Sequence, residues 1–218
     1  VSSAMSGVTN DLIIKSKKIS NDFDVQELDV LLSAGEQLAC SLLAGRLRHL
    51  GYNSRSWLAW QIPIMTSGDY KSSRIINIKK NKIHKYLKSN GIPIITGFQG
   101  INKKSRVTTL GRGGSDTSAI MVAKFFKANK CIIYTDVDGV MTTDPRVVNK
   151  AKKIKVISYE EMLEMSSVGS KVMQSSSVKE ARINRINVDV KSSFQNKSGT
   201  LITKRKNIIN LSLIQISR

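Results

Sequence analysis

The sequence predicts an α/β fold with a largely parallel sheet. Short β-branched runs alternate with helical patterns of roughly ten residues, an order typical of parallel sheets covered by helices. The run Cys131–Thr135 is apolar almost throughout, as expected of a strand buried on both faces. Hydrophobic residues make up 40% of the 218 residues, which is enough to bury a core, so the chain is not predominantly disordered.

The predicted elements follow from local patterns along the chain. Helices are predicted where apolar residues recur with helical spacing, at Leu38–Leu50 (ended by Gly51), Thr117–Asn129, Glu160–Val168 and Val178–Arg185. Strands are predicted at short β-branched runs, at Ile62–Met65, Ile92–Thr96, Cys131–Thr135 and Val188–Lys191. Ser158 and Glu161 fit a capping box before the third helix. The tail, 206–218, is given no place in the fold.

The charge raises nucleic acid as a candidate partner. The chain has 35 Lys and Arg against 16 Asp and Glu, a net charge of +19. The basic residues are spread along the chain, however, and are not interleaved with aromatic side chains on which bases stack. Lys, Ile and Asn are abundant while Arg is sparse, a bias that A/T-rich codons produce by themselves. Nucleic-acid binding is therefore not expected, although an anionic phosphate ligand would benefit from this field.

Membrane spans and cysteine frameworks are not expected either. No apolar run approaches the ~18–20 residues that span a bilayer, which excludes an integral membrane protein. The two cysteines, Cys40 and Cys131, form no CxxC pair, which excludes a disulfide scaffold and a cysteine zinc site. We therefore expect a cytoplasmic protein.

The segment Thr108–Ser118 carries the strongest chemical pattern. Its glycines allow backbone N–H groups to face an anion, and the helix that follows directs its positive N-terminus to the same place. Arg112 can hold a carboxylate through two parallel hydrogen bonds. The loop matches neither the Walker A motif nor GxGxxG, which argues against the usual NTPase and Rossmann interpretations. The alternative is a plain turn in which Ser115 or Asp116 caps the helix.

A second pattern lies at Tyr134–Arg146, after the apolar strand. Ligands of open α/β sheets bind at the carboxyl ends of strands. Three carboxylates, two adjacent hydroxyls and an Arg suit a nucleotide or a Mg²⁺-bound phosphate. An EF-hand is excluded because Gly139 comes too early and no Glu closes the loop. A turn-rich loop with Asp-Gly and Asp-Pro is the alternative.

Three weaker segments each have a structural alternative. Ser33–Glu36 either forms a capping box at a helix start or supplies a carboxylate to a substrate ammonium. The N-terminal segment Val1–Asn10 is a hydroxyl-rich turn that can donate hydrogen bonds to a carboxylate. Lys171, taken alone, has the pattern of a surface lysine.

Together these segments resemble the aspartokinases of the amino acid kinase family. The resemblance is carried, in family order, by Ser3–Asn10, Ser33–Glu36, Gly97–Gly100, Thr108–Asp116, Thr135–Arg146 and Ser158–Lys171. It implies a three-layer αβα sandwich around an eight-stranded, mainly parallel sheet, in an amino acid kinase domain at 1–205. Aspartate would bind in a lobe at about 1–107 and ATP in a lobe at about 108–205.

The resemblance also implies roles for residues that bind the substrate. Arg112 would clamp the aspartate α-carboxylate, and Glu36 would pair with its ammonium. The hydroxyls of Ser3, Thr9 and Ser115 would surround the substrate carboxylates.

Catalytic and nucleotide-binding roles are implied for a second set. Asp116 would organise the catalytic lysines, and Lys171 would join it as a catalytic residue. The nucleotide would contact Gly113, Gly114, Thr135, Asp136, Val140, Met141, Asp144, Pro145, Arg146 and Lys171. Two positions depart from the family, which often has Tyr in place of Met141 and Arg in place of Ser176. No residue is assigned as a metal ligand.

The implied reaction is attack of the aspartate β-carboxylate on the γ-phosphorus of Mg-ATP. It yields 4-phospho-aspartate and ADP, the first step toward lysine (through diaminopimelate), threonine and methionine. A carboxylate is already ionised at pH 7, so no general base is required. Catalysis then consists of alignment and of neutralising charge on the transferred phosphoryl group. ATP and Mg²⁺ are the expected cofactors, and a homo-oligomer stays open for the full-length protein.

The two ends of the chain depart from the family pattern. Related enzymes open with a Lys-Phe/Tyr-Gly-Gly-Thr/Ser-Ser strand and loop, whose lysine contacts the transferred phosphate, and continue into paired ACT domains that bind lysine or threonine. The sequence contains neither. We therefore expect the first strand of the sheet to be missing and the chain to have little or no kinase activity.

Other functions remain as alternatives. One is another amino acid kinase, of the acetylglutamate or glutamate 5-kinase type, although Glu36 and Arg112 suit a free α-amino acid. The other is a non-catalytic fragment or a basic nucleic-acid binder.

Overall fold

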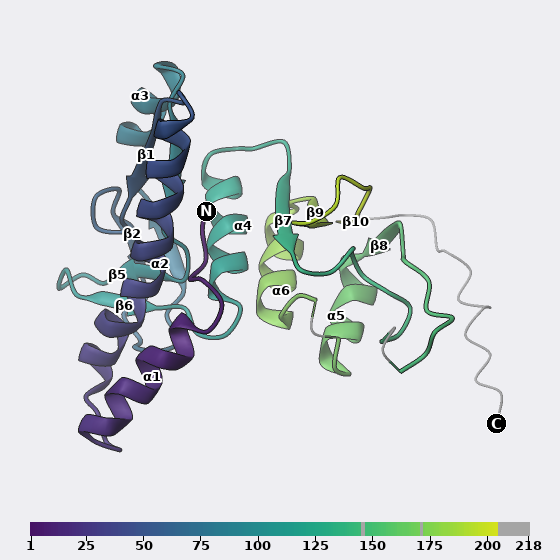
Figure 1. Cartoon of the computed structure of the whole chain (residues 1–218), viewed down its shortest axis with the longest axis horizontal. Coiled ribbons are helices and arrows are strands. Elements are labelled where there is room, and N and C mark those ends of the chain that lie inside the picture. Colours follow the sequence, from purple (N-terminus) through teal and green to yellow (C-terminus); the bar gives the residue numbers. More distant parts are fainter. Residues whose placement is uncertain (145–146, 171, 205–218) are drawn as a thin grey trace. The chain divides into compact units, whose positions relative to one another are not determined.

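The computed structural model describes residues 1–144, 147–170 and 172–204, and divides into two units, Val1–Asn129 and Lys130–Arg218 (Figure 1). Helix α4 (Gly114–Phe125) belongs to the first unit, where Met121 is part of the core. The predicted tail, 206–218, lies outside the described residues.

The long helix α2 (Val25–His49) organises the first unit. It begins after Asp24, whose Oδ1 accepts hydrogen bonds from the N–H groups of Gln26 (2.9 Å) and Glu27 (3.0 Å). It ends before Gly51, whose φ of 87° is a left-handed conformation that favours glycine. The helix therefore starts well before the predicted Leu38.

Of the two alternatives for Ser33–Glu36, the capping box at a helix start is wrong, because both residues lie inside α2. The Ser33 hydroxyl instead donates to the Val30 carbonyl of the preceding turn (2.7 Å). A shorter helix, α1 (Val8–Ile19), precedes α2 and was not predicted from the sequence.

By length and composition alone, α2 would be able to cross a membrane, contrary to the expectation that no segment qualifies. Its buried residues include Asp29, Ser33 and Glu36, and each of them bonds to another part of the unit or to its own helix. Because Asp29 and Ser33 are bonded to protein partners and one carboxylate oxygen of Glu36 accepts from Ala4, α2 has the character of a core helix.

Two sheets support α2 in the first unit. One pairs β1 (Ser54–Trp57) in parallel with β4 (Ile92–Ile95). The other has the order β3-β2-β5-β6 and mixes parallel with antiparallel pairing; its strands are β2 (Ile64–Thr66), β3 (Ile75–Ile78), β5 (Gln99–Ile101) and β6 (Val107–Thr109). Helix α3 (Asn81–Lys88) joins β3 to β4.

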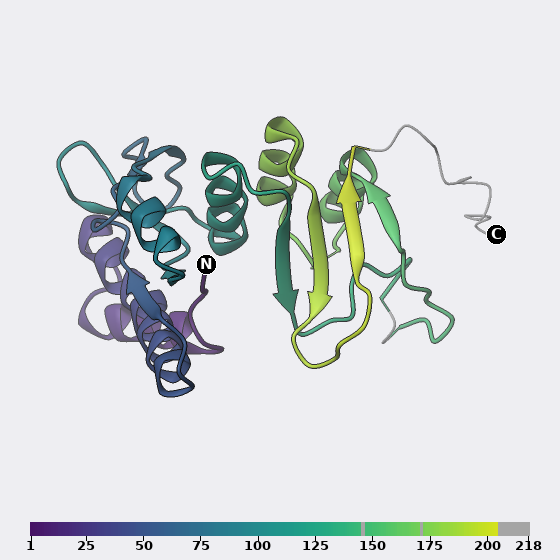
Figure 2. The ribbon, with the colours of Figure 1, turned by 90° about the horizontal axis from the view of Figure 1, so that it is seen from above.

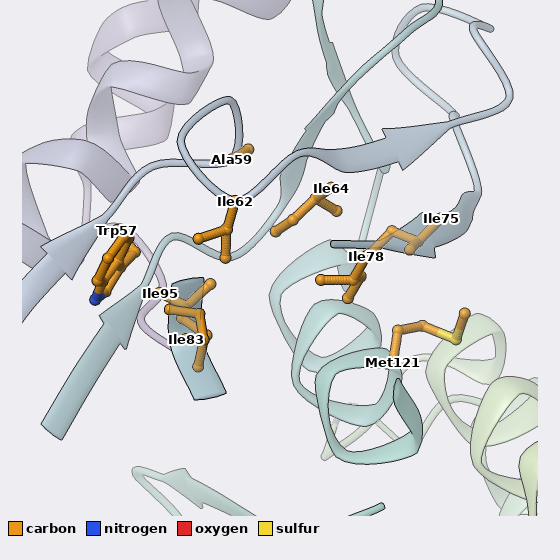
Figure 3. Packing of buried hydrophobic residues seen from close by; sticks show 9 residues of the cluster. All are labelled: Trp57, Ala59, Ile62, Ile64, Ile75, Ile78, Ile83, Ile95 and Met121. Atoms are coloured by element: carbon orange, nitrogen blue, oxygen red, sulfur yellow. The ribbon is translucent and has the colours of Figure 1, made fainter. Parts of the chain in front are cut away.

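Isoleucine side chains build the core between these elements. Ile62, Ile64, Ile78 and Ile83 are almost fully buried, and Trp57 and Met121 pack with them, as Figure 3 shows. A smaller cluster joins Cys40 and Ala44 of α2 to Ile94 of β4, which attaches the helix to the sheet.

The second unit is built on one mixed sheet of order β7-β9-β10-β8, seen in Figure 2. Its strands are β7 (Cys131–Thr135), β8 (Val156–Ser158), β9 (Val188–Ser192) and β10 (Thr200–Thr203). The helices α5 (Tyr159–Ser167) and α6 (Ser175–Asn184) pack against each other. The predicted capping box is confirmed: the Ser158 Oγ accepts from the Glu161 N–H (3.1 Å), and Glu161 Oε2 accepts from the Ser158 N–H (2.8 Å).

The α/β fold is confirmed, but the described strands do not form the single eight-stranded, mainly parallel sheet that was expected. They form separate sheets in which antiparallel pairs such as β2–β3 and β9–β10 alternate with parallel ones. Many strands have only three or four residues, so each pairs over a short length. Ser2 adds an isolated parallel bridge to Thr96 beyond the end of β4.

Candidate active site

Glu36 is a buried carboxylate on α2 that contacts the start of the chain. It is 3% exposed, and its Oε1 accepts a hydrogen bond from the Ala4 N–H (3.1 Å). Its Oε2 is buried and has no hydrogen-bond partner among the residues that the structure describes. Burial raises the pKa of Glu36 to about 7, because removal from water disfavours the charged form. A ligand cation at Oε2 would supply the missing partner and favour the carboxylate.

The N-terminal loop approaches α2 closely because the residue before Glu36 is glycine. A Cβ on Gly35 would lie 3.0 Å from the Cβ of Ala4 and 3.3 Å from a methyl group of Val8. In the sequence, Ser3 is adjacent to Ala4 and Thr9 is adjacent to Val8. This packing places the N-terminal loop against α2 at the residue next to Glu36.

The glycine loop between β6 and α4 faces the same N-terminal residues. Gly113 is the N-cap of α4 with φ 73°, so Ser115 and Asp116 lie in the first helical turn and neither caps the helix. A Cβ on Gly97 would lie 3.0 Å from both the Ser115 Oγ and the Ser2 carbonyl oxygen. A side chain at position 97 would crowd these groups, which come from three segments.

Hydrogen bonds hold this loop against β4 and β5. The Phe98 N–H donates to the Ser118 Oγ (3.0 Å), and the Leu110 N–H donates to the Phe98 carbonyl (2.9 Å). A Cβ on Gly114 would lie 2.7 Å from the Phe98 ring, so this glycine is needed for packing. The predicted segments 97–100 and 108–116 thus form one connected structure.

The two charged residues of the loop have different environments. Arg112 is exposed between β6 and α4. Asp116 is partly buried, and burial raises its pKa to about 6. At pH 7 this carboxyl is mostly ionised and would gain from a nearby cation.

Sequence reasoning missed Asp29, a fully buried carboxylate one turn before Ser33. It accepts hydrogen bonds from the Thr109 N–H (2.8 Å), the Thr109 hydroxyl (2.7 Å) and the Lys71 N–H (3.0 Å to the nearer oxygen). Gln99 makes a similar link, donating from Nε2 to the Ser33 carbonyl (3.0 Å). A signal was present, since polar residues at 29, 33 and 36 recur with helical spacing in an otherwise apolar helix.

In the second unit, the predicted loop begins at the carboxyl end of β7. The Thr135 hydroxyl donates to Asp136 Oδ1 (3.0 Å), and the Ser193 N–H donates to the Thr135 carbonyl (2.7 Å). The ends of β7 and β9 are therefore linked beside the exposed Asp136.

The next residues of this loop have structural contacts. Val140 is fully buried, and its N–H donates to the Thr200 Oγ1 (2.9 Å). Met141 forms an isolated bridge with Lys153, and the carbonyl of Asp144 accepts from the N–H of Val147 (3.0 Å). Pro145, Arg146 and Lys171 lie outside the described residues.

The described carboxylates do not gather into a metal cage. No group of three or more His, Cys, Asp or Glu side chains is placed to hold a metal ion in the parts of the chain that the structure describes. Magnesium bound mainly by substrate phosphates needs only one or two protein carboxylates.

Comparison with known proteins identifies the family. The model of the amino acid kinase family matches residues 1–192. An aspartokinase of Rickettsia felis is 46% identical over 215 residues, which is 96% of this chain and 54% of that protein. The chain thus spans about half the length of the curated relatives it matches.

Solved structures agree with this match. Aspartokinase III of E. coli in complex with aspartate and ADP superposes with a TM-score of 0.80 at 29% identity, covering 91% of this chain and 45% of that one. An aspartate kinase from Synechocystis gives a TM-score of 0.80 at 37% identity, covering 93% and 34%. The sequence match, the shared architecture and the ordered motifs agree: the chain belongs to the amino acid kinase family.

Proposed function

We propose that this chain is the catalytic part of an aspartate kinase, which transfers the γ-phosphate of ATP to the β-carboxylate of L-aspartate. The observation that carries the proposal is Glu36, a buried carboxylate with one unpartnered oxygen beside a hydroxyl-rich loop. Such a group suits an ammonium ion, which can donate to the free oxygen and offset the cost of burying a charge. The relatives named aspartokinase support the choice of amino acid.

The first unit would bind aspartate by its two ends. Glu36 would accept from the α-ammonium and Arg112 would hold the α-carboxylate through its planar guanidinium. Ser3, Thr9 and Ser115 would donate to the carboxylate oxygens. Ala4 and Val8 pack on Gly35, and Ser2 and Ser115 pack on Gly97, which supports this arrangement because it brings the segments that carry these hydroxyls together.

ATP would use the glycine loop and the second unit. Gly113 is the N-cap of α4 and Gly114 its first residue, and the N-terminus of a helix favours a phosphate. The Gly114 N–H itself donates to the Gly111 carbonyl (3.0 Å). Thr135, Asp136 and the loop through Asp144 would contact the rest of the nucleotide at the carboxyl end of β7. We assign Pro145, Arg146 and Lys171 to the same contact from the sequence pattern alone.

In the proposed step, a β-carboxylate oxygen of aspartate forms a bond to the γ-phosphorus while the bond from that phosphorus to the β–γ bridging oxygen breaks. ADP leaves with the bonding electrons, and no proton is transferred. Mg²⁺ would neutralise phosphate charge, and Asp116 would position lysine side chains at the transferred group. We place the protein in the cytoplasm, at the first step toward lysine, threonine and methionine, without a nucleic-acid or membrane partner.

Calorimetric titration tests the proposal without requiring turnover. We expect L-aspartate to bind saturably and N-acetyl-L-aspartate, which lacks the ammonium, to bind at least tenfold more weakly. Glu36→Gln should remove this discrimination. Equal binding of the two ligands would contradict the role of Glu36, and tighter binding of N-acetyl-L-glutamate would select an acetylglutamate kinase instead.

A further inference from the structure

A pocket of about 560 Å³ lies in the first unit, and none of the residues that line it is assigned to aspartate or ATP. It is lined by aromatic and basic side chains from β1, the turn after β1, and α3: Arg55, Trp57, Trp60, Lys82, Lys85 and Tyr86. Among the residues that the structure describes, no acidic side chain lines it. The segment 51–90 that builds it has eight Lys and Arg residues against one Asp. The pocket therefore combines flat apolar surface with a local excess of positive charge.

The aromatic wall is held in place. Trp57 is 5% exposed and meets Tyr86 edge to face, with ring centroids 5.6 Å apart. The Arg55 guanidinium lies 4.3 Å from the Trp57 ring centroid. The Trp57 Nε1 is buried without a partner among the described residues, and Figure 3 shows this nitrogen at the end of the ring turned away from Ile62. This buried indole N–H thus lacks an acceptor in the described part of the chain, which is costly.

Trp60 provides an open aromatic surface at the same pocket. It is 56% exposed, yet it stands on a closed turn. The Gln61 N–H donates to the Leu58 carbonyl (2.9 Å), and the Gln61 Oε1 accepts from the Leu58 N–H (3.0 Å). A large exposed indole on a turn fixed at both ends is suited to stacking on a planar ring at low entropic cost.

The cations are presented by one face of α3. Lys82 and Lys85 are three residues apart, so they neighbour each other on the helix surface. The Lys82 ammonium donates to the Gln61 carbonyl (3.0 Å), which holds it next to the Trp60 turn. Both lysines are exposed and available to an anion.

We propose that this pocket binds a small anionic ligand with a planar ring, of the nucleoside monophosphate class. The ring would stack on Trp60, and the phosphate would lie between Arg55, Lys82 and Lys85. The volume is in the range of small-molecule sites. Stacking and charge together select this class over inorganic phosphate, which has no ring, and over a free nucleoside, which has no charge. The same chemistry is offered by a free nucleotide and by one unit of a single strand.

Intrinsic fluorescence tests the proposal directly, because Trp57 and Trp60 are the only tryptophans in the chain. Titration with AMP should change the emission saturably. Inorganic phosphate and adenosine should each bind at least tenfold more weakly. Lys82→Ala combined with Lys85→Ala should weaken AMP at least fivefold, whereas Lys88→Ala, an exposed lysine of the same helix outside the pocket, should leave it unchanged.

Three outcomes would overturn the proposal. One is a linear, unsaturable response to AMP. Another is equal affinity in the double variant, which would place the AMP response at a different site. The third is saturation by an oligothymidylate but not by AMP, which would make the surface a single-strand contact. Mg-ADP binding at the proposed catalytic site uses other residues, so these results leave the kinase proposal unaffected.

Discussion

At the scale of single residues, the buried carboxylate of Glu36 makes aspartate binding dependent on pH. Its pKa is raised to about 7 by burial, and an ammonium ligand requires the ionised form. We predict that aspartate affinity falls about tenfold between pH 8 and pH 6, since at pH 6 only roughly a tenth of Glu36 is charged. Calorimetry across this range measures it. Affinity that is flat with pH would contradict the assignment.

The same pKa shift predicts that the stability of the folded chain changes with pH in the direction opposite to aspartate affinity. Between about pH 4.5 and 7 the folded chain keeps a proton on Glu36 that the unfolded chain has released, so stability falls as pH rises through this window. The cost at pH 8 is up to about 3 kcal/mol. Glu36→Gln should therefore gain stability relative to the natural chain at pH 8 but not at pH 4. Urea unfolding midpoints of both chains at pH 8 and pH 4 test this prediction. A Glu36→Gln chain that is less stable than the natural chain at pH 8 only would disprove it.

Arg112 allows a test of geometry at constant charge. Arg112→Lys keeps the positive charge but loses the planar fork that holds a carboxylate through two bonds. We predict at least tenfold weaker aspartate binding with Mg-ADP binding nearly unchanged. Arg74→Lys, at an exposed position of the same unit, is the matched control. Unchanged aspartate affinity and kcat in the full-length protein would remove the role given to Arg112.

At the scale of elements, α2 is attached through Asp29 to β6, the strand that precedes the glycine loop. Its carboxylate accepts from the Thr109 N–H and hydroxyl and from the Lys71 N–H. Asp29→Ala would leave these donors unpaired in a buried place and should lower the free energy of unfolding by about 3 kcal/mol. Asp22→Ala, on the exposed surface, should change it by less than about 0.5 kcal/mol. Urea unfolding measures the free energy of unfolding of both variants. A similar loss in Asp29→Ala and Asp22→Ala would contradict a structural role for Asp29.

Helix and strand positions were predictable where local signals coincide with the true boundary. β7 was predicted at its observed bounds, because a short apolar run is flanked by turn residues. α2 was predicted too short, because Ser33 and Glu36 imitate a helix start although their polar atoms serve tertiary contacts. This conflict between local pattern and tertiary contacts is itself a sign of a functional site, because buried polar residues in an apolar helix destabilise the fold unless they have partners.

At the scale of the whole molecule, the ordered motifs were enough to predict the family, and the match over residues 1–192 confirms it. The sheet arrangement was not predictable from them, because strands of three or four residues carry little register information and pair in both directions. The pocket beside Trp60 was also missed, since its cations and aromatics come from separate segments that only the fold brings together.

The central claim is that one unit binds aspartate and the other contributes most of the nucleotide site. Hydrogen exchange on the chain with each ligand alone tests it most directly. We predict that L-aspartate slows exchange of amides at 2–9 and 110–118 and leaves 135–144 unchanged, whereas Mg-ADP slows exchange at 135–144. Protection of 135–144 by aspartate alone, or no protection of 2–9 and 110–118 at saturating aspartate, would contradict it.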